Sequence, residues 1–281
     1  MLIHVPMKKF ILLFLLLSVR ASAQDCPQYI AEHVVGSRPT VPAAYFLIEA
    51  LKKVQASQDS SNSLVYLESF SVAEALPYTT QTSVQIEIEK KRILCRNEET
   101  IHAKGNIRQS KTGQMPALNL SLDPGLPQLL HTRETIYDLL STGKLQYGET
   151  FRRLISPVEV AGNVARGTLE SHPIFRGESA IHPTLLDAAF HVLAGFSNDQ
   201  AIRTRPDHVA VPAYFAFVHW DPSISSSDGK YVSTVRLHRD SSKPDQVTYD
   251  LVLENSQHQV LLTIEEGQLQ IANLSRLVKA N

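Results

Sequence analysis

Two stretches of this sequence are apolar on almost every side, which is the pattern of buried helices. The first covers about 42–55, where Pro42 fits the first helical position and nearly every residue to Leu51 is apolar. The second begins at Pro183, and its apolar run continues to Leu193 with Asp187 and His191 inside it. The chain is therefore expected to place two long helices in its core.

Shorter runs around these helices alternate apolar and polar residues, or are rich in β-branched residues, and predict strands. A short helix is expected near 133–142, and Ser, Asp and Pro mark loops at 197–209 and 222–229. The strands are expected near 64–72, 81–90, 91–96, 99–108, 153–160, 163–170, 230–239, 246–254 and 258–271.

The order of these elements predicts two α+β halves, each with one helix wrapped by an antiparallel sheet. The first half is expected to cover 24–115 and the second 131–273, with a tail at 274–281. Residues 116–130, which contain Pro116, Pro124, Gly125 and Pro127, predict a linker between the halves.

Asp187 and His191 are four residues apart, so they share one face of the second helix. An acid and an imidazole in an apolar helix are costly unless they are paired or used, so a self-satisfied structural pair and a functional pair both stay open. His33 begins a second run of interest, which passes through Gly36 and Ser37 to Pro42 at the first helix. A surface histidine at the end of a strand is the alternative reading of His33.

Composition removes several function classes. The net charge of -1 and the lack of a basic tract argue against nucleic acid as a partner. Neither the two cysteines nor the histidines have metal-ligand spacing, and no glycine-rich phosphate loop is present. Any chemistry is therefore expected to depend on side chains alone.

The N-terminal residues 1–23 have the pattern of a secretory signal peptide. Lys8 and Lys9 supply positive charge, 10–19 form an apolar core, and 21–23 are small residues suited to cleavage. This pattern predicts a periplasmic or secreted protein, with a cytoplasmic protein as the alternative. Export would permit a disulfide between Cys26 and Cys95, and the sequence leaves this pairing open.

With these residues in view, the chain resembles the dehydratase domains of modular polyketide synthases over about 28–272. The family's motif HPxLLDxxx(Q/H) is complete from His182 to His191. The motif HxxxGxxxxP keeps His33 and Pro42, although Ser37 stands at the glycine position and Gly36 lies one place early. Weaker matches in the same order are 101–105 to HAxG, Tyr147–Phe151 to YGPxF with Glu149 replacing proline, Val211–Pro212 to an LP turn, and 266–269 to the final strand.

The resemblance implies an α+β double hotdog, in which two antiparallel sheets are each wrapped around a long central helix. It implies a hydro-lyase of polyketide biosynthesis that removes water from a 3-hydroxyacyl thioester and leaves an α,β-unsaturated chain. The substrate would arrive on the phosphopantetheine arm of an acyl carrier protein, with no other cofactor and no metal. A homodimer is left open.

In this reaction His33 is the expected base for the α-proton, and Asp187 the acid that protonates the leaving hydroxyl. The two side chains should then lie roughly 3–6 Å apart, although they are 154 positions apart (187 minus 33). His191 would orient Asp187. The remaining residues of the expected substrate-binding set are Tyr147, Gly148, Pro42, Pro212, and Gly36 with Ser37, whose backbone N–H groups would polarise the thioester carbonyl.

Three alternatives use the same fold. A double-bond isomerase and a pyran-forming cyclase need the same acid and base, and the sequence does not separate them from a dehydratase. A non-catalytic double hotdog that binds an acyl chain needs neither His33 nor Asp187.

Overall fold

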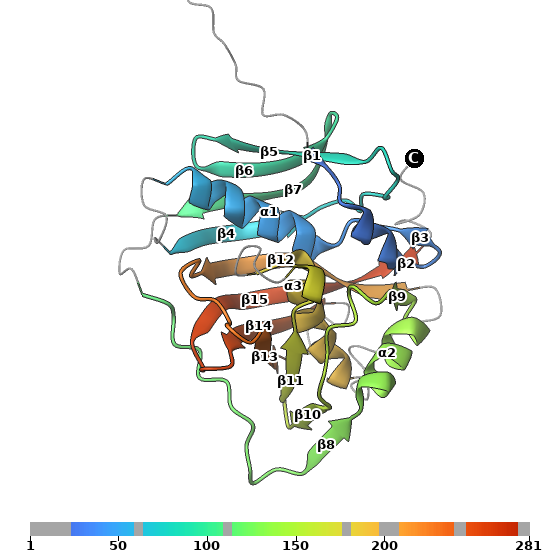
Figure 1. Cartoon of the computed structure of the whole chain (residues 1–281), viewed down its shortest axis with the longest axis vertical. Coiled ribbons are helices and arrows are strands. Elements are labelled where there is room, and N and C mark those ends of the chain that lie inside the picture. Colours follow the sequence, from blue (N-terminus) through green and yellow to red (C-terminus); the bar gives the residue numbers. More distant parts are fainter. Residues whose placement is uncertain are drawn as a thin grey trace, which may run out of the picture.

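The computed structural model describes residues 24–58, 64–108, 114–175, 181–196, 208–238 and 246–274. Twelve strands form one large antiparallel sheet in the order β1-β5-β6-β7-β4-β12-β15-β14-β13-β11-β10-β8, and three more form a small sheet in the order β3-β2-β9. Both long helices, α1 and α3, lie on the same side of the large sheet (Figure 1). This is the α+β arrangement, with helices wrapped by sheet, that the sequence predicts.

The first half is built around α1 (Ala43–Ala56), whose buried residues lie on all sides of the helix. Large side chains such as Tyr45, Phe46 and Leu47 are fully buried there, which is why the helix carries so few polar residues. The strands around it are β1 (Gln24–Asp25), β4 (Val65–Val72), β5 (Ser83–Glu89), β6 (Arg92–Asn97) and β7 (Thr100–Arg108).

The second half is built around α3 (Pro183–His191), in which every residue is buried, and around the 3-10 helix η3 (Val192–Phe196) that continues it. The short helix α2 (Arg133–Thr142) has the predicted bounds. The strands of this half are β8 (Gln128–His131), β10 (Val158–Ala161), β11 (Val164–Glu170), β12 (His208–Trp220), β13 (Lys230–His238), β14 (Gln246–Asn255) and β15 (Val260–Asn273).

Strand β12 joins the two halves, because it pairs with β4 on one side and with β15 on the other. The sequence analysis predicts no strand there, and Pro212 is unusual inside a strand because it lacks the N–H that a central strand needs. The register of β12 against β15 shifts between Pro212 and Tyr214, and β4 pairs with β12 only from Tyr214 onward. The proline therefore lies beside a bulge, in the part of β12 that pairs with β15 alone, where a missing N–H is tolerated.

The small sheet consists of β2 (His33–Val35), β3 (Arg38–Pro39) and β9 (Leu145–Tyr147), and the sequence reading missed these short strands. Two further 3-10 helices are η1 (Gln28–Glu32) and η2 (Pro173–Phe175). Because β9 belongs to the second half, the small sheet connects the first-half residue His33 to Tyr147.

The predicted signal peptide lies outside the described residues, and so does most of the predicted tail.

The possible disulfide between Cys26 and Cys95 is not formed, because both residues are buried free thiols. No helix within the described ranges is long and apolar enough to cross a membrane.

Candidate active site

His33 begins β2, and its buried imidazole packs against the rings of Tyr147 and Phe151, which also contact each other. Its Nδ1 lies 2.7 Å from the carbonyl oxygen of Thr40. A carbonyl only accepts hydrogen bonds, so Nδ1 carries the hydrogen and Nε2 of the neutral ring has a free lone pair. The hairpin from β2 to β3 thus fixes the tautomer that a base requires.

Asp187 lies in the middle of α3, only 5% exposed. Its Oδ2 is 3.1 Å from Nε2 of His191, one turn later on the same helix face. Its Oδ1 is 4.0 Å from Nε2 of His33. This separation lies within the range expected from the sequence. Two residues that are 154 positions apart (187 minus 33) therefore meet, one at the start of β2 and the other in α3.

Burial is the dominant influence on the imidazole of His33. It lowers the pKa of His33 below its ordinary value, and the charge of Asp187 only partly opposes this shift. His33 is therefore neutral near pH 7, which is the state that can accept a proton. Burial also raises the pKa of Tyr147 well above its ordinary range, so this phenol keeps its proton and can donate a hydrogen bond.

Tyr147 faces His33 directly across the small sheet, and its ring also packs on His191 with ring centroids 4.1 Å apart. Gly148 does not line the cavity described below. A Cβ at Gly148 would overlap the side chain of Glu32, so the absence of a side chain lets η1 approach this turn. The expected contact of Gly148 with substrate is replaced by a packing role.

The expected role of Gly36 and Ser37 needs correction. Gly36 has a φ of +67°, and its N–H donates to the carbonyl of Lys144 at 2.8 Å. Both residues lie in the turn between β2 and β3, and neither lines the cavity. The Gly36 N–H is committed to the contact with Lys144 and cannot polarise a thioester carbonyl.

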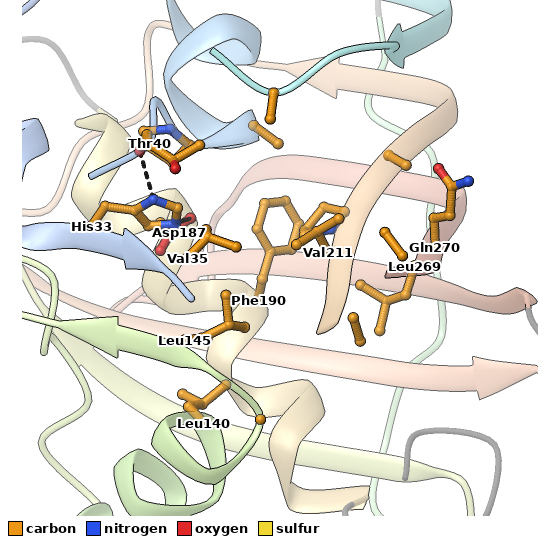
Figure 2. A pocket seen from close by; sticks show the side chains of 18 of the residues that line it. His33, Val35, Thr40, Leu140, Leu145, Asp187, Phe190, Val211, Leu269 and Gln270 are labelled. Atoms are coloured by element: carbon orange, nitrogen blue, oxygen red, sulfur yellow. Dashed lines mark hydrogen bonds and ion pairs between the residues drawn. The ribbon is translucent and has the colours of Figure 1, made fainter. Parts of the chain in front are cut away.

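The acid and the base open into a cavity of about 410 Å³, a size typical of ligand pockets. Pro42 and Pro212 line it, as do Tyr147 and His191. Figure 2 shows His33 and Asp187 side by side at one end, Phe190 in the middle, and Gln270 far from the pair. Most of the lining side chains are apolar, including Val35, Val72, Leu140, Leu145, Phe190, Leu193, Val211 and Leu269.

The start of α1 also reaches this cavity. Pro42 is the N-cap residue and makes no side-chain cap, and Ala43, the first helical residue, lines the cavity. The first N–H groups of a helix have no partner inside the helix, and they lie at its positive end. This helix start can therefore bind a carbonyl oxygen that gains negative charge.

His182 is a residue whose structural role the sequence reading missed. Its Nδ1 accepts from the backbone N–H of Thr184 at 3.3 Å, so the imidazole caps α3 five residues before Asp187. Its ring stacks on Phe175 with centroids 3.7 Å apart. Burial, with smaller contributions from Lys52 and His172, lowers the pKa of His182 to about 3, so the ring stays neutral and remains an acceptor.

We expect His182→Phe to lower the free energy of unfolding by roughly 0.5–2 kcal/mol. Phenylalanine keeps the ring against Phe175 but removes the nitrogen that caps α3. Urea unfolding followed by circular dichroism measures the change. Unchanged stability would mean that the cap does not contribute.

The described residues contain no group of three or more His, Cys, Asp or Glu side chains that could hold a metal ion. The chemistry proposed below uses only the side chains and backbone groups around the cavity.

Among protein families, the model of the polyketide synthase dehydratase N-terminal domain matches residues 116–274 of the chain. No curated protein sequence matches the chain. Among solved structures, the dehydratase domain from the CurJ module of curacin polyketide synthase is similar with a TM-score of 0.72 and 16% identity, covering 89% of each chain.

Two further structures are similar over most of their length. The dehydratase domain of PpsC from Mycobacterium tuberculosis, in complex with C12:1-CoA, has a TM-score of 0.69 and 18% identity, covering 89% of this chain and 92% of that one. An isomerase-inactive variant of the GphF dehydratase has a TM-score of 0.72 and 23% identity, covering 91% of each chain. These likenesses confirm the double-hotdog fold. With the family match over more than half of its length, the chain belongs to the polyketide synthase dehydratase family.

Proposed function

We propose that the protein removes water from 3-hydroxyacyl thioesters. The observation that carries the proposal is the separation of 4.0 Å between Nε2 of His33 and Oδ1 of Asp187, in a largely apolar cavity. Family membership supports hydro-lyase chemistry in general, and the substrate and the roles of the residues are our proposal.

His33 Nε2 takes the proton from C2 of the substrate, and the electron pair left on C2 delocalises to the thioester oxygen. The pair then forms the C2=C3 double bond while the C3–O bond breaks. Asp187 gives its proton to the departing hydroxyl, which leaves as water. The enzyme is left with protonated His33 and ionised Asp187, and one proton transfer between them restores both groups.

Three neighbours support these two groups. His191 Nε2–H donates to Oδ2 of Asp187, which leaves Oδ1, on the His33 side, for the proton that is transferred. The Tyr147 hydroxyl is proposed to hold the C3 hydroxyl before it leaves. The start of α1 at Ala43 replaces Gly36 and Ser37 as the proposed site for the thioester oxygen.

The remaining expectations about substrate delivery stay proposals. The thioester is proposed to be carried on a phosphopantetheine arm, and the partner to be an acyl carrier protein. The PpsC relative was solved with an acyl-CoA, which supports a thioester substrate in this fold. Export to the periplasm or medium is proposed from residues 1–23, and a homodimer stays open.

The lowered pKa of His33 predicts the position of the acid limb of the pH–rate profile. His33 is a base only when neutral, so kcat/KM should fall as the pH drops through its lowered pKa. We expect the midpoint of the acid limb of kcat/KM to lie below 6.5, the ordinary pKa of histidine. A midpoint at or above 6.5 would contradict this assignment of the base.

A double-bond isomerase is the second candidate, because the GphF relative is described through an isomerase-inactive variant. Product analysis by mass spectrometry and NMR separates the two functions. A dehydratase yields a product lighter by one water with its double bond between C2 and C3, whereas an isomerase moves the double bond of an enoyl thioester without loss of mass.

A further inference from the structure

Three arginine side chains gather around one tyrosine of α2. Arg133 begins this helix, and Arg152 and Arg153 lie in the segment between β9 and β10. The guanidinium carbon of Arg152 lies 4.5 Å from the centre of the Tyr137 ring, and that of Arg133 lies 5.8 Å from it. Burial raises the pKa of the Tyr137 phenol to about 12, and the charges of all three arginines oppose this shift. We call these three residues the arginine cluster.

The arginine cluster has no anionic partner within the part of the chain that the structure describes. Arginines elsewhere, such as Arg108 and Arg236, pair with carboxylates, but no carboxylate there pairs with the guanidinium groups of the cluster. Nη2 of Arg133 donates to the carbonyl of Arg152, and Nη2 of Arg153 donates to the carbonyl of Glu149. These acceptors are neutral, so the hydrogen bonds leave the positive charges uncompensated.

This concentration of positive charge is unfavourable without an anion. Burial is the main influence that lowers the pKa of Arg153, and the charge of Arg133 lowers it further, whereas Glu149 and Glu170 raise it only from beyond ion-pair distance. Arg133 also stands at the first position of α2, where the helix dipole is positive. The face of the Tyr137 ring attracts two of the cations, and packing on this ring is the alternative explanation of the cluster.

We propose that the arginine cluster binds a phosphate group, either free phosphate or a phosphomonoester. All three side chains are half-buried, so a ligand can reach them from solvent. The planar guanidinium group presents its N–H donors as a fork that matches the oxygens of phosphate. A phosphate also carries more negative charge than a carboxylate near neutral pH, so it compensates several arginines at once.

This site is separate from the active-site cavity. Neither the arginine cluster nor Tyr137 lines the cavity, and the other contacts of the Tyr137 ring are with His191, at 5.5 Å, and Tyr147, at 6.5 Å. Figure 1 shows α2 at the lower right, beside β9. A phosphate held by Arg133 and Arg152 would link α2 to the segment that follows β9. Binding should therefore stabilise the folded protein, whichever reaction the cavity catalyses.

The test is isothermal titration calorimetry of the full chain with inorganic phosphate near neutral pH, at an ionic strength held constant with sodium chloride. We expect saturable binding at a single site, and a melting temperature that rises with phosphate more than with sodium chloride of equal ionic strength. Absence of saturable binding, or an equal effect of the two salts, would overturn the proposal. Glycerol 3-phosphate separates the two sources: tighter binding than inorganic phosphate indicates a phosphomonoester, and weaker binding indicates free phosphate.

A matched pair of variants tests the location of the site. Arg152→Gln should raise the Kd for inorganic phosphate by roughly 10- to 100-fold, the effect of losing charge-assisted hydrogen bonds. Arg92→Gln removes the same charge from an exposed position in β6, far from α2 in Figure 1, and should change the Kd by less than about twofold.

Arg153→Gln provides a second variant of the cluster if Arg152→Gln does not fold, and we expect it to weaken binding to a similar extent. Circular dichroism and melting temperature show which variants are folded. Full affinity in a folded cluster variant would place the phosphate elsewhere and leave the arginines with only a packing role on Tyr137. An equal loss of affinity in Arg92→Gln would show non-specific attraction to positive charge. Either result would overturn the proposal.

Discussion

Asp187→Asn should lower kcat for dehydration by roughly 100- to 10,000-fold, the usual contribution of a general acid. Asparagine keeps the size of the side chain and can still contact His191, but it has no proton of suitable acidity to give to the leaving hydroxyl. The measurement is steady-state conversion of 3-hydroxyoctanoyl thioester to its unsaturated product.

Asp250 supplies a matched control for this variant. It is as buried as Asp187, at 5% exposed, but lies in β14, where it pairs with Arg236 and His238 instead of lining the cavity. Asp250→Asn should reduce stability and leave kcat of the folded protein within about twofold. If Asp187→Asn kept the full rate, the assignment of the acid would be wrong.

His33→Phe should lower kcat to a similar extent, by roughly 100- to 10,000-fold. Phenylalanine retains a ring that packs against Tyr147 and Phe151 but has no nitrogen to accept the C2 proton. Circular dichroism and melting temperature would show whether the variant remains folded, so that the loss can be assigned to chemistry.

His102 provides the corresponding control, because it is also a buried histidine whose Nδ1 contacts a backbone carbonyl, that of Glu74. Its ring stacks on Phe46 and does not line the cavity. His102→Phe should keep the activity of the folded protein. An equal loss of activity in both variants would indicate a structural effect and not the removal of a base.

The sequence predicted the parts of the fold that rest on apolar patterning. The two buried helices, the helix at 133–142 and most long strands agree with the structure within a few residues, because continuous burial leaves a clear hydrophobic signal. Strand β12 is absent from the prediction. Pro212 lacks the N–H of an ordinary strand residue, and only the bulge and the register against β15 show how the strand accommodates it.

The sequence identified only part of the candidate site, because some of its contacts join residues that are far apart in the chain. Motif residues identified His33, Asp187, His191 and Tyr147, and the structure brings these four together. The turn at Gly36 was misread, because the sequence does not reveal that the N–H of Gly36 bonds to Lys144, more than a hundred positions away. Such long-range backbone contacts leave no local pattern.

Incubation of the purified protein with 3-hydroxyoctanoyl N-acetylcysteamine thioester measures whether it catalyses loss of water. We expect a product lighter by one water, with its double bond between C2 and C3. Asp187→Asn should form this product about 100-fold or more slowly than the wild-type protein. Saturable binding of the thioester with no loss of water, and with no isomerised or cyclised product from the matching substrates, would instead show a non-catalytic acyl-binding protein.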